Sequence, residues 1–497
     1  MAGHNRREHQ DKLTIGAQVQ QTVRRPRLLV IGLSIVVLTV AVLQTAVVPV
    51  LGVIAEQLDE STSAVSWAVT ANLLAAAAAT PLIGRLADLY RKKRVLLVVL
   101  AVVLVGSVLA ATTSSLPWLI VARVLQAASF ALYPICIAIL REEIDPDRMV
   151  SAMAVLSGTL GFGGGTGLVV VGLLMHGDAG YHRVFYLTTA FTVVVIIIVA
   201  TLVPNRARTT SGSIDWFGAV GLAVGLSALL LAITQGNTWG WGSPRTLACL
   251  AGGISVLIAW WMWEKRATRP LVSTRMLARR SMLFTNLATI FVGMGLYFAF
   301  LGLTVFVQVD RSVAGYGFGA TVLEASVVYL LPGALTGFVV ALISGRFIDR
   351  YGARPVLMVA AVAGIAGFVL IAFAHSAPWQ VITANILANA YISLGYGALP
   401  ALIVGDSDAG ETGVATGMNA IARTVGSSMA AALVAVLLSR TTAVGTPMES
   451  SFTIIFLGGA ATAVLVMLLI AASRPRTQSV PSEEARYESR AMNHEWG

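Results

Sequence analysis

Fourteen apolar runs, each long enough to cross a lipid bilayer as a helix, dominate this sequence of 497 residues. A helix needs about 20 apolar residues to cross a hydrocarbon core that is about 30 Å thick. Hydrophobic residues make up 57% of the chain and charged residues only 12%, whereas a soluble domain carries about 25% charge. The sequence therefore predicts an all-α polytopic membrane protein and excludes a water-soluble fold.

The predicted spans are separated by short polar loops. They cover residues 28–51, 64–83, 95–113, 117–140, 150–175, 183–203, 216–234, 246–264, 282–308, 320–343, 355–374, 378–402, 413–438 and 452–472. The segments outside the first and last span, 1–27 and 473–497, are predicted to be tails, and the second is expected to be disordered because it is polar and of mixed charge.

The distribution of Lys and Arg predicts the orientation in the membrane. An even number of spans puts both termini on one side, and that side receives 28 of the 34 Lys and Arg residues. Because cytoplasmic loops carry the excess of basic residues, both termini are predicted to be cytoplasmic. The net charge of +10 then faces anionic lipid, so no nucleic-acid partner is needed to explain it.

Residue types that hold metals or cofactors are scarce in the spans. The two cysteines, Cys136 and Cys249, lie in separate apolar runs and cannot form a cysteine-ligated metal site. All six histidines fall in predicted tails or outer loops, so no span offers a base next to a nucleophile. The sequence predicts no metal, no cofactor and no enzyme.

An internal repeat indicates that the chain contains two related halves. The segment Gly84-Arg85-Leu86-Ala87-Asp88-Leu89-Tyr90-Arg91 recurs as Gly345-Arg346-Phe347-Ile348-Asp349-Arg350-Tyr351-Gly352, and Pro117-Trp118 recurs as Pro378-Trp379, both at an offset of 261 residues. Removing residues 216–281 reduces this offset to 195, which is the length that six spans with their loops require. The predicted organisation is a six-helix bundle (28–203), two inserted helices (216–264) and a second six-helix bundle (282–472).

These motifs resemble those of the major facilitator superfamily over nearly the whole chain. The first repeat, followed by Lys92-Lys93-Arg94, is similar to the family's loop motif between spans two and three, and Leu119-x-x-x-Arg123-x-x-Gln126 is similar to its fourth-span motif. The segments Ile214-Asp215-Trp216-x-Gly218, Gly240-Trp241-x-Ser243-Pro244, Glu264-x-x-x-x-x-Pro270-Leu271 and Asn419-x-x-Arg423-x-x-Gly426 resemble the branch of drug:proton antiporters with fourteen spans.

The resemblance implies a function. We expect a secondary transporter that exports amphipathic or cationic small molecules, such as drugs or antibiotics, by alternating access and in exchange for protons. A monomer in the lipid bilayer is expected, and the resemblance implies that the membrane is the plasma (inner) membrane. Export of a lipid or of a dedicated natural product, uptake, and a membrane sensor that transports nothing remain alternatives, because a fold does not fix a substrate.

The repeated motif is expected to act as a gate. The resemblance implies that Asp88 accepts hydrogen bonds from a helix N-terminus in the other half when the cytoplasmic side closes, an arrangement that favours the outward-facing state. Gly84, Arg91, Gly345 and Asp349 are the other residues expected in this gate.

Three charges are predicted inside the membrane. Arg123 and Arg423 lie within spans, where an unpaired charge costs at least about 2.5 kcal/mol. The branch usually has an aspartate and an asparagine in its first span, but Val40 and Thr45 stand there. Proton coupling must then use another carboxylate, and Glu324 is the best placed, with Arg423 as its counter-charge.

Polar residues near these charges complete the predicted pathway. Gln44 matches the depth of Arg123, Asn419 lies one turn from Arg423, and Asn72 is expected to line or flank the same path. The Gly-rich run that contains Gly161 and Gly165 lacks the spacing of a nucleotide-binding loop, so these glycines are predicted to allow close helix packing.

Overall fold

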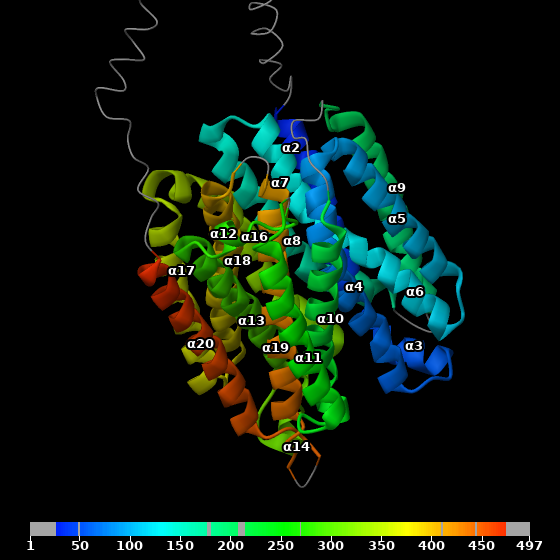
Figure 1. Cartoon of the computed structure of the whole chain (residues 1–497). Helices are drawn as coiled ribbons and strands as arrows, with labels where there is room; N and C mark the ends of the chain where they lie inside the picture. The colour runs from blue at the N-terminus through cyan, green and yellow to red at the C-terminus, as the bar shows by residue number, and fades with distance from the viewer. Residues whose placement is uncertain are drawn as a thin grey trace, which may run out of the picture.

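The computed structural model of the chain describes residues 26–47, 50–175, 180–206, 214–268, 270–408, 411–442 and 445–473. Within these ranges 14 helices are long and apolar enough to cross a membrane, which confirms the predicted number. The described residues form no strand, and their only β-type pairing is an isolated bridge between Thr441 and Pro447. The protein is therefore an all-helical, multi-pass membrane protein (Figure 1).

The first six spans form one bundle. Its helices are α2 (Pro26–Thr45), α4 (Thr62–Leu89), α5 (Lys92–Thr112), α6 (Leu116–Gln126) continued through a 3₁₀ turn (Ala127–Ala131) into α7 (Leu132–Glu143), α8 (Pro146–Leu174) and α9 (His182–Leu202). The short helix α3 (Leu51–Gln57) lies between the first and second spans. Helix α2 packs on α7, α8 and α9, and α5 packs on α6 and α9.

The last six spans form the second bundle. Its helices are α13 (Arg280–Gln308), a tenth span made of α15 (Val322–Glu324), a π-helical turn (Ala325–Leu330) and α16 (Leu331–Tyr351), then α17 (Ala353–Phe373), α18 (Pro378–Asp406), α19 (Thr412–Leu438) and α20 (Glu449–Ala472). Two short helices, α12 (Thr274–Leu277) and α14 (Arg311–Ala314), lie in its loops. The two bundles meet where α8 packs on α16 and α18 and where α19 packs on α4 and α7.

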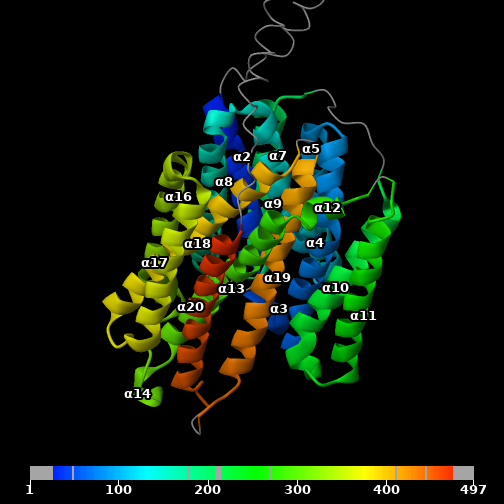
Figure 2. The same cartoon turned by 60° about the vertical axis from the view of Figure 1, so that its left-hand side comes forward.

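The two inserted helices form a hairpin beside both bundles. Helices α10 (Trp216–Trp239) and α11 (Pro244–Glu264) pack on each other, and α10 also packs on α4 and α19 (Figure 2). The amide of Gln235 donates to the hydroxyl of Thr70 on α4 at 3.2 Å, and the amide of Asn237 donates to the carbonyl of Ala432 on α19 at 2.9 Å. The hairpin therefore holds one helix of each bundle.

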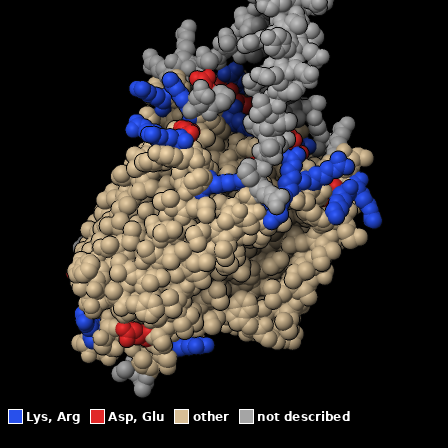
Figure 3. All heavy atoms as spheres, turned by 90° about the vertical axis from the view of Figure 1, so that its left-hand side faces the viewer, with Lys and Arg blue, Asp and Glu red and all other residues tan. Residues whose placement is uncertain are grey.

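Charge divides the molecule into two ends. Lys and Arg side chains gather at the end where α2 begins and α20 ends, and a broad uncharged belt follows (Figure 3). We call this the basic end, and the other the opposite end. Large apolar side chains such as Val98, Ile197, Val359 and Phe373 are exposed on the outer faces of the bundles, as contact with lipid tails requires.

The second and tenth spans end six and eight residues later than the sequence predicted, and the first ends six residues earlier, at Thr45 instead of residue 51. The second was expected to end at residue 83 and the tenth at 343, but α4 continues to Leu89 and α16 to Tyr351. The repeated motif therefore forms the last helical turns, and only Tyr90 and Arg91 separate α4 from α5. The prediction was wrong because charged residues end a hydropathy run at the membrane surface, whereas the helix continues beyond the hydrocarbon.

Candidate functional site

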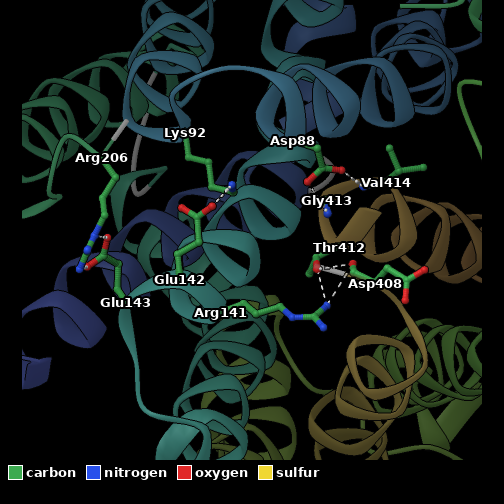
Figure 4. Close-up of polar contacts among 10 residues, drawn as sticks. All are labelled: Asp88, Lys92, Arg141, Glu142, Glu143, Arg206, Asp408, Thr412, Gly413 and Val414. Atoms are coloured by element: carbon green, nitrogen blue, oxygen red, sulfur yellow. Dashed lines mark hydrogen bonds and ion pairs between the residues drawn. The ribbon is translucent and has the colours of Figure 1, made fainter. Parts of the chain in front are cut away.

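Asp88 joins the two bundles at the basic end. Its side chain, only 3% exposed, points from the last turn of α4 to the first turn of α19 (Figure 4). One carboxylate oxygen accepts the peptide N–H of Gly413 at 2.9 Å, and the other accepts that of Val414 at 3.0 Å. The first N–H groups of a helix have no partner within the helix and carry partial positive charge, so an aspartate there is favourable on both counts.

Glycines allow α4 and α19 to approach. A Cβ atom on Gly84 would lie 2.8 Å from the carbonyl oxygen of Gly413, and one on Gly413 would lie 2.7 Å from a carboxylate oxygen of Asp88. Both distances are shorter than a van der Waals contact, so any larger residue at either position would push the helices apart. The contact of Asp88 with α19 depends on this small-residue packing.

The second copy of the motif makes the related contact on the other side. Asp349 of α16 accepts the hydroxyl of Ser151 on α8 at 2.9 Å. Position 151 lies 261 residues before Thr412, so α8 faces Asp349 much as α19 faces Asp88. A Cβ atom on Gly345 would lie 2.6 Å from the Ser151 hydroxyl oxygen. The duplicated sequence therefore produces a duplicated contact between the bundles.

Arg141 adds a third connection between the bundles. From the last turn of α7, its guanidinium donates to the Thr412 hydroxyl at 2.5 Å (Figure 4). It also donates to the Ser407 carbonyl at 3.0 Å and to the Ser407 hydroxyl at 3.1 Å. Ser407 follows the end of α18, and Thr412 is the first residue of α19. Arg141 thus fixes the loop that leads into the helix end bound by Asp88.

Two ion pairs brace the first bundle beside this contact. Lys92 at the start of α5 pairs with Glu142 of α7, and Arg206 donates to the two oxygens of Glu143 at 2.5 and 2.9 Å (Figure 4). The hydrogen bonds from Arg206 to Glu143 raise the pKa of the Arg206 guanidinium. The pairs keep the end of α7 in place, and with it Arg141.

Four of the five predicted gate residues meet in these contacts. Gly84, Asp88, Gly345 and Asp349 lie at the two points where the bundles join at the basic end. Arg91 is the N-cap residue of α5 and makes no hydrogen bond to the second bundle among the described residues.

Arg123 is buried in the first bundle, where backbone carbonyls surround it. Its guanidinium donates to the carbonyls of Ala68 and Leu43, both at 3.3 Å, and to the side-chain oxygen of Gln126 at 2.7 Å. The Asn72 amide donates to the carbonyl of Arg123 itself at 2.7 Å. This network links α6 with α2 and α4.

Arg423 lies in the second bundle, near the middle of the membrane-spanning helix α19. It is half-buried on α19, and its guanidinium carbon lies 5.1 Å from the ring centre of Tyr396 and 5.5 Å from that of Tyr133. Asn419, one turn earlier, is buried and donates to the hydroxyl of Thr289 at 2.7 Å, which ties α19 to α13.

The remaining predicted site residues lie apart from this pair. Glu324 is exposed at the start of the tenth span, where its carboxylate accepts the N–H of Thr321 at 2.9 Å, and no ion pair in the described part of the chain joins it to Arg423. The amide nitrogen of Gln44 is buried with no hydrogen-bond partner in that part of the chain. Gly161 and Gly165 belong to α8, and their surroundings lie outside the described residues.

Comparison with known families agrees with this architecture. The family model of the Major Facilitator Superfamily matches residues 33–431, with a second match over 318–493. The chain belongs to the major facilitator superfamily. Its fold is that of the superfamily, two six-helix bundles with two inserted helices, and the protein is a transporter of small molecules rather than an enzyme.

Relatives within the superfamily differ in what they carry. The tetracenomycin C resistance and export protein of Streptomyces glaucescens is 28% identical over 436 residues, which is 84% of this chain and 76% of that protein. The uridine/deoxyuridine transporter of Lactococcus lactis subsp. cremoris is 29% identical over 329 residues, or 65% of this chain and 68% of that one. The crystal structure of the human organic anion transporter MFSD10 (TETRAN) has the same fold, with a TM-score of 0.61 at 15% identity, and the match covers 90% of this chain and 99% of that one.

Two features of this superfamily member were missed by sequence reasoning. Arg141 was counted only as one of the basic residues that set the orientation, although it lies beside Glu142 and Glu143, a run of charges at a predicted helix end. The tyrosines around Arg423 come from separate helices, and no local pattern in the sequence connects them.

Proposed function

We propose that this chain exports amphipathic small molecules by alternating access, through rocking of its two six-helix bundles. The contact of Asp88 with Gly413 and Val414 carries the proposal. A gate must hold one access path shut and release it when the bundles rock, and a hydrogen-bonded contact at one end of the membrane meets that need. If the basic end is cytoplasmic, as the positive-inside rule predicts, the gate is closed toward the cytoplasm and the conformation faces outward.

We further propose that export is driven by inward movement of protons across the bacterial plasma membrane, in a monomer with both termini cytoplasmic. Glu324 is the proposed proton carrier. Its exposure at the opposite end supports this role, because a carboxylate there can exchange protons with water outside the cell. The first span offers no carboxylate for the purpose.

Transport by inside-out vesicles tests the proposal. The vesicles are given fluorescein or rhodamine 123, planar dyes of opposite charge, with the proton gradient present or collapsed. We expect at least one dye to accumulate inside, accumulation to stop when the gradient collapses, and Glu324→Gln to abolish it while Glu60→Gln, the same change at another exposed position of the opposite end, does not.

Each part of the proposal has its own contrary result. Accumulation that survives collapse of the gradient would exclude proton coupling, and full activity of Glu324→Gln would exclude this carrier. Depletion of the dyes from the vesicles would indicate uptake into cells rather than export.

A further inference from the structure

Arg423 lies near the middle of the membrane-spanning helix α19 and at the boundary between the bundles. It is eleven residues from the start of α19 at the basic end, a distance of about 16 Å along the helix axis. Tyr133 of α7 and Tyr396 of α18 are each ten residues from the basic end of their helices, about 15 Å along the axis, so all three lie at a similar depth. Tyr133 belongs to the first bundle and the other two residues to the second.

Tyrosines surround the guanidinium of Arg423. The rings of Tyr133 and Tyr396 lie within cation–π distance, and Tyr297 of α13 is also within electrostatic reach. The hydroxyl of Tyr133 is held by Ser157 at 2.7 Å, which fixes that ring. Tyr133 and Tyr396 are buried in this conformation, whereas Arg423 and Tyr297 are half-buried, so the cation and one ring are the accessible parts of the cluster.

The two arginines in the membrane use their donors differently. Arg123 is 2% exposed and gives three hydrogen bonds to protein oxygens. Arg423 is half-buried, and its guanidinium has no hydrogen-bond acceptor or carboxylate partner among the described residues. A guanidinium has five N–H donors, and leaving them unpaired within the membrane is costly. Arg423 therefore has binding capacity that the protein does not use.

We propose that Arg423 and the three tyrosines form the substrate site, and that the site takes planar aromatic molecules carrying an anionic oxygen group such as a carboxylate or phenolate. The inference rests on the proposed transport function and narrows it. Arg423 binds the oxygen group through its fork of N–H donors, and the half-buried ring of Tyr297 packs on the aromatic part, joined by Tyr396 and Tyr133 when the bundles separate. Cations are disfavoured, because Arg423 repels them and no carboxylate of the described residues pairs with it to cancel its charge.

Binding of two dyes to the purified full-length protein in lipid nanodiscs tests the proposal. Fluorescein and rhodamine 123 share a xanthene ring system, but the first is anionic and the second cationic, and fluorescence polarisation measures the affinity of each. We expect fluorescein to bind at least about tenfold more tightly. Arg423→Gln should weaken fluorescein binding at least about tenfold, and Arg423→Lys, which keeps the charge but loses the fork, should weaken it less.

Control variants separate the site from general effects. Arg440→Gln removes the same charge from an exposed position at the opposite end and should bind fluorescein as the wild type does. Tyr396→Phe keeps the ring and should retain most of the affinity, whereas Tyr396→Leu should lose it, and this pair tests the site even if Arg423→Gln is unstable.

Three results would overturn the inference: equal or tighter binding of rhodamine 123, no binding of either dye, or fluorescein binding that Arg423→Gln leaves unchanged. A protein that transports rhodamine 123 in vesicles but binds no fluorescein would be an exporter with a different substrate class. One that binds fluorescein through Arg423 but transports nothing would refute the proposed function and leave the site intact.

Discussion

Replacing Asp88 by Asn should open the basic end. The carboxylate of Asp88 accepts two peptide N–H groups of α19, at 2.9 and 3.0 Å. Asn keeps one acceptor oxygen but turns an NH₂ group toward the other N–H, and it removes the charge that the helix N-terminus stabilises. A hydrogen bond to a charged group is worth about 1.5–3 kcal/mol, and the charge–dipole interaction up to about 2 kcal/mol.

Because the Asn side chain retains one bond, the net loss should be about 2–3 kcal/mol. Since 1.4 kcal/mol corresponds to a factor of ten, the equilibrium between the closed and open basic end should shift roughly 30- to 150-fold toward the open form. Side chains buried between the bundles at this end would then become accessible to water for a larger fraction of the time.

A cysteine between the bundles measures this shift. Ser344 is fully buried on α16, and a Cβ atom on Gly397 of α18 would lie 3.5 Å from its hydroxyl oxygen and 3.7 Å from the Cα of Ala154 on α8, which belongs to the first bundle. The reporter Ser344→Cys, with Cys136 and Cys249 changed to Ala, is treated with a water-soluble maleimide. Asp88→Asn should speed its labelling, and Asp59→Asn, the same change at an exposed position of the opposite end, should not. Equal labelling rates in the two variants would refute the gate.

Three further changes test other contacts. Arg123→Lys cannot reach all three acceptors of the guanidinium and should lower the free energy of unfolding by about 2 kcal/mol, seen as a lower thermal midpoint of the purified protein. Gly413→Ala puts a methyl group 2.7 Å from an Asp88 oxygen and should speed labelling of the same reporter. Burial and the nearby Asp408 raise the pKa of Glu411 above its ordinary 4.5. The stability that protonated Glu411 contributes is therefore complete below pH 4.5 and is lost as the pH rises through the raised pKa. Glu411→Gln should flatten the curve of thermal midpoint against pH over this interval.

The sequence predicted the membrane fold well because the physics leaves few options. A chain in lipid must satisfy every backbone hydrogen bond within a helix, so each apolar run of sufficient length becomes one span. The ends of α4 and α16 were missed because hydropathy reports the hydrocarbon boundary, and a helix need not stop there. Gly84 and Asp88 continue α4 beyond it, where contact with α19 holds the helix end.

The candidate site was predictable only where the sequence repeats. The offset of 261 residues identified Asp88 and Asp349 as a pair, and both lie at contacts between the bundles. Arg141 has its acceptors 266 and 271 residues away in the chain, and nothing near Arg141 in the sequence indicates them. The same holds for the rings around Arg423, since the contacts between helices that bring them together are set by the whole fold.

The inserted hairpin restricts how the two bundles can rock, because α10 is hydrogen-bonded to one helix of each bundle. Gln235 and Asn237 lie on the last turns of α10, near the opposite end, and they bind α4 of the first bundle and α19 of the second. These are the two helices that Asp88 joins at the basic end. When the basic end opens and the opposite end closes, α4 and α19 must change their separation at the level of α10, so α10 must tilt with them or release Thr70 or the Ala432 carbonyl. A double variant that removes the side-chain amides of Gln235 and Asn237 should therefore change the rate at which the basic end opens. The hydrogen bonds of Asp88 to α19 should stay as they are, since they lie at the other end of the same helices.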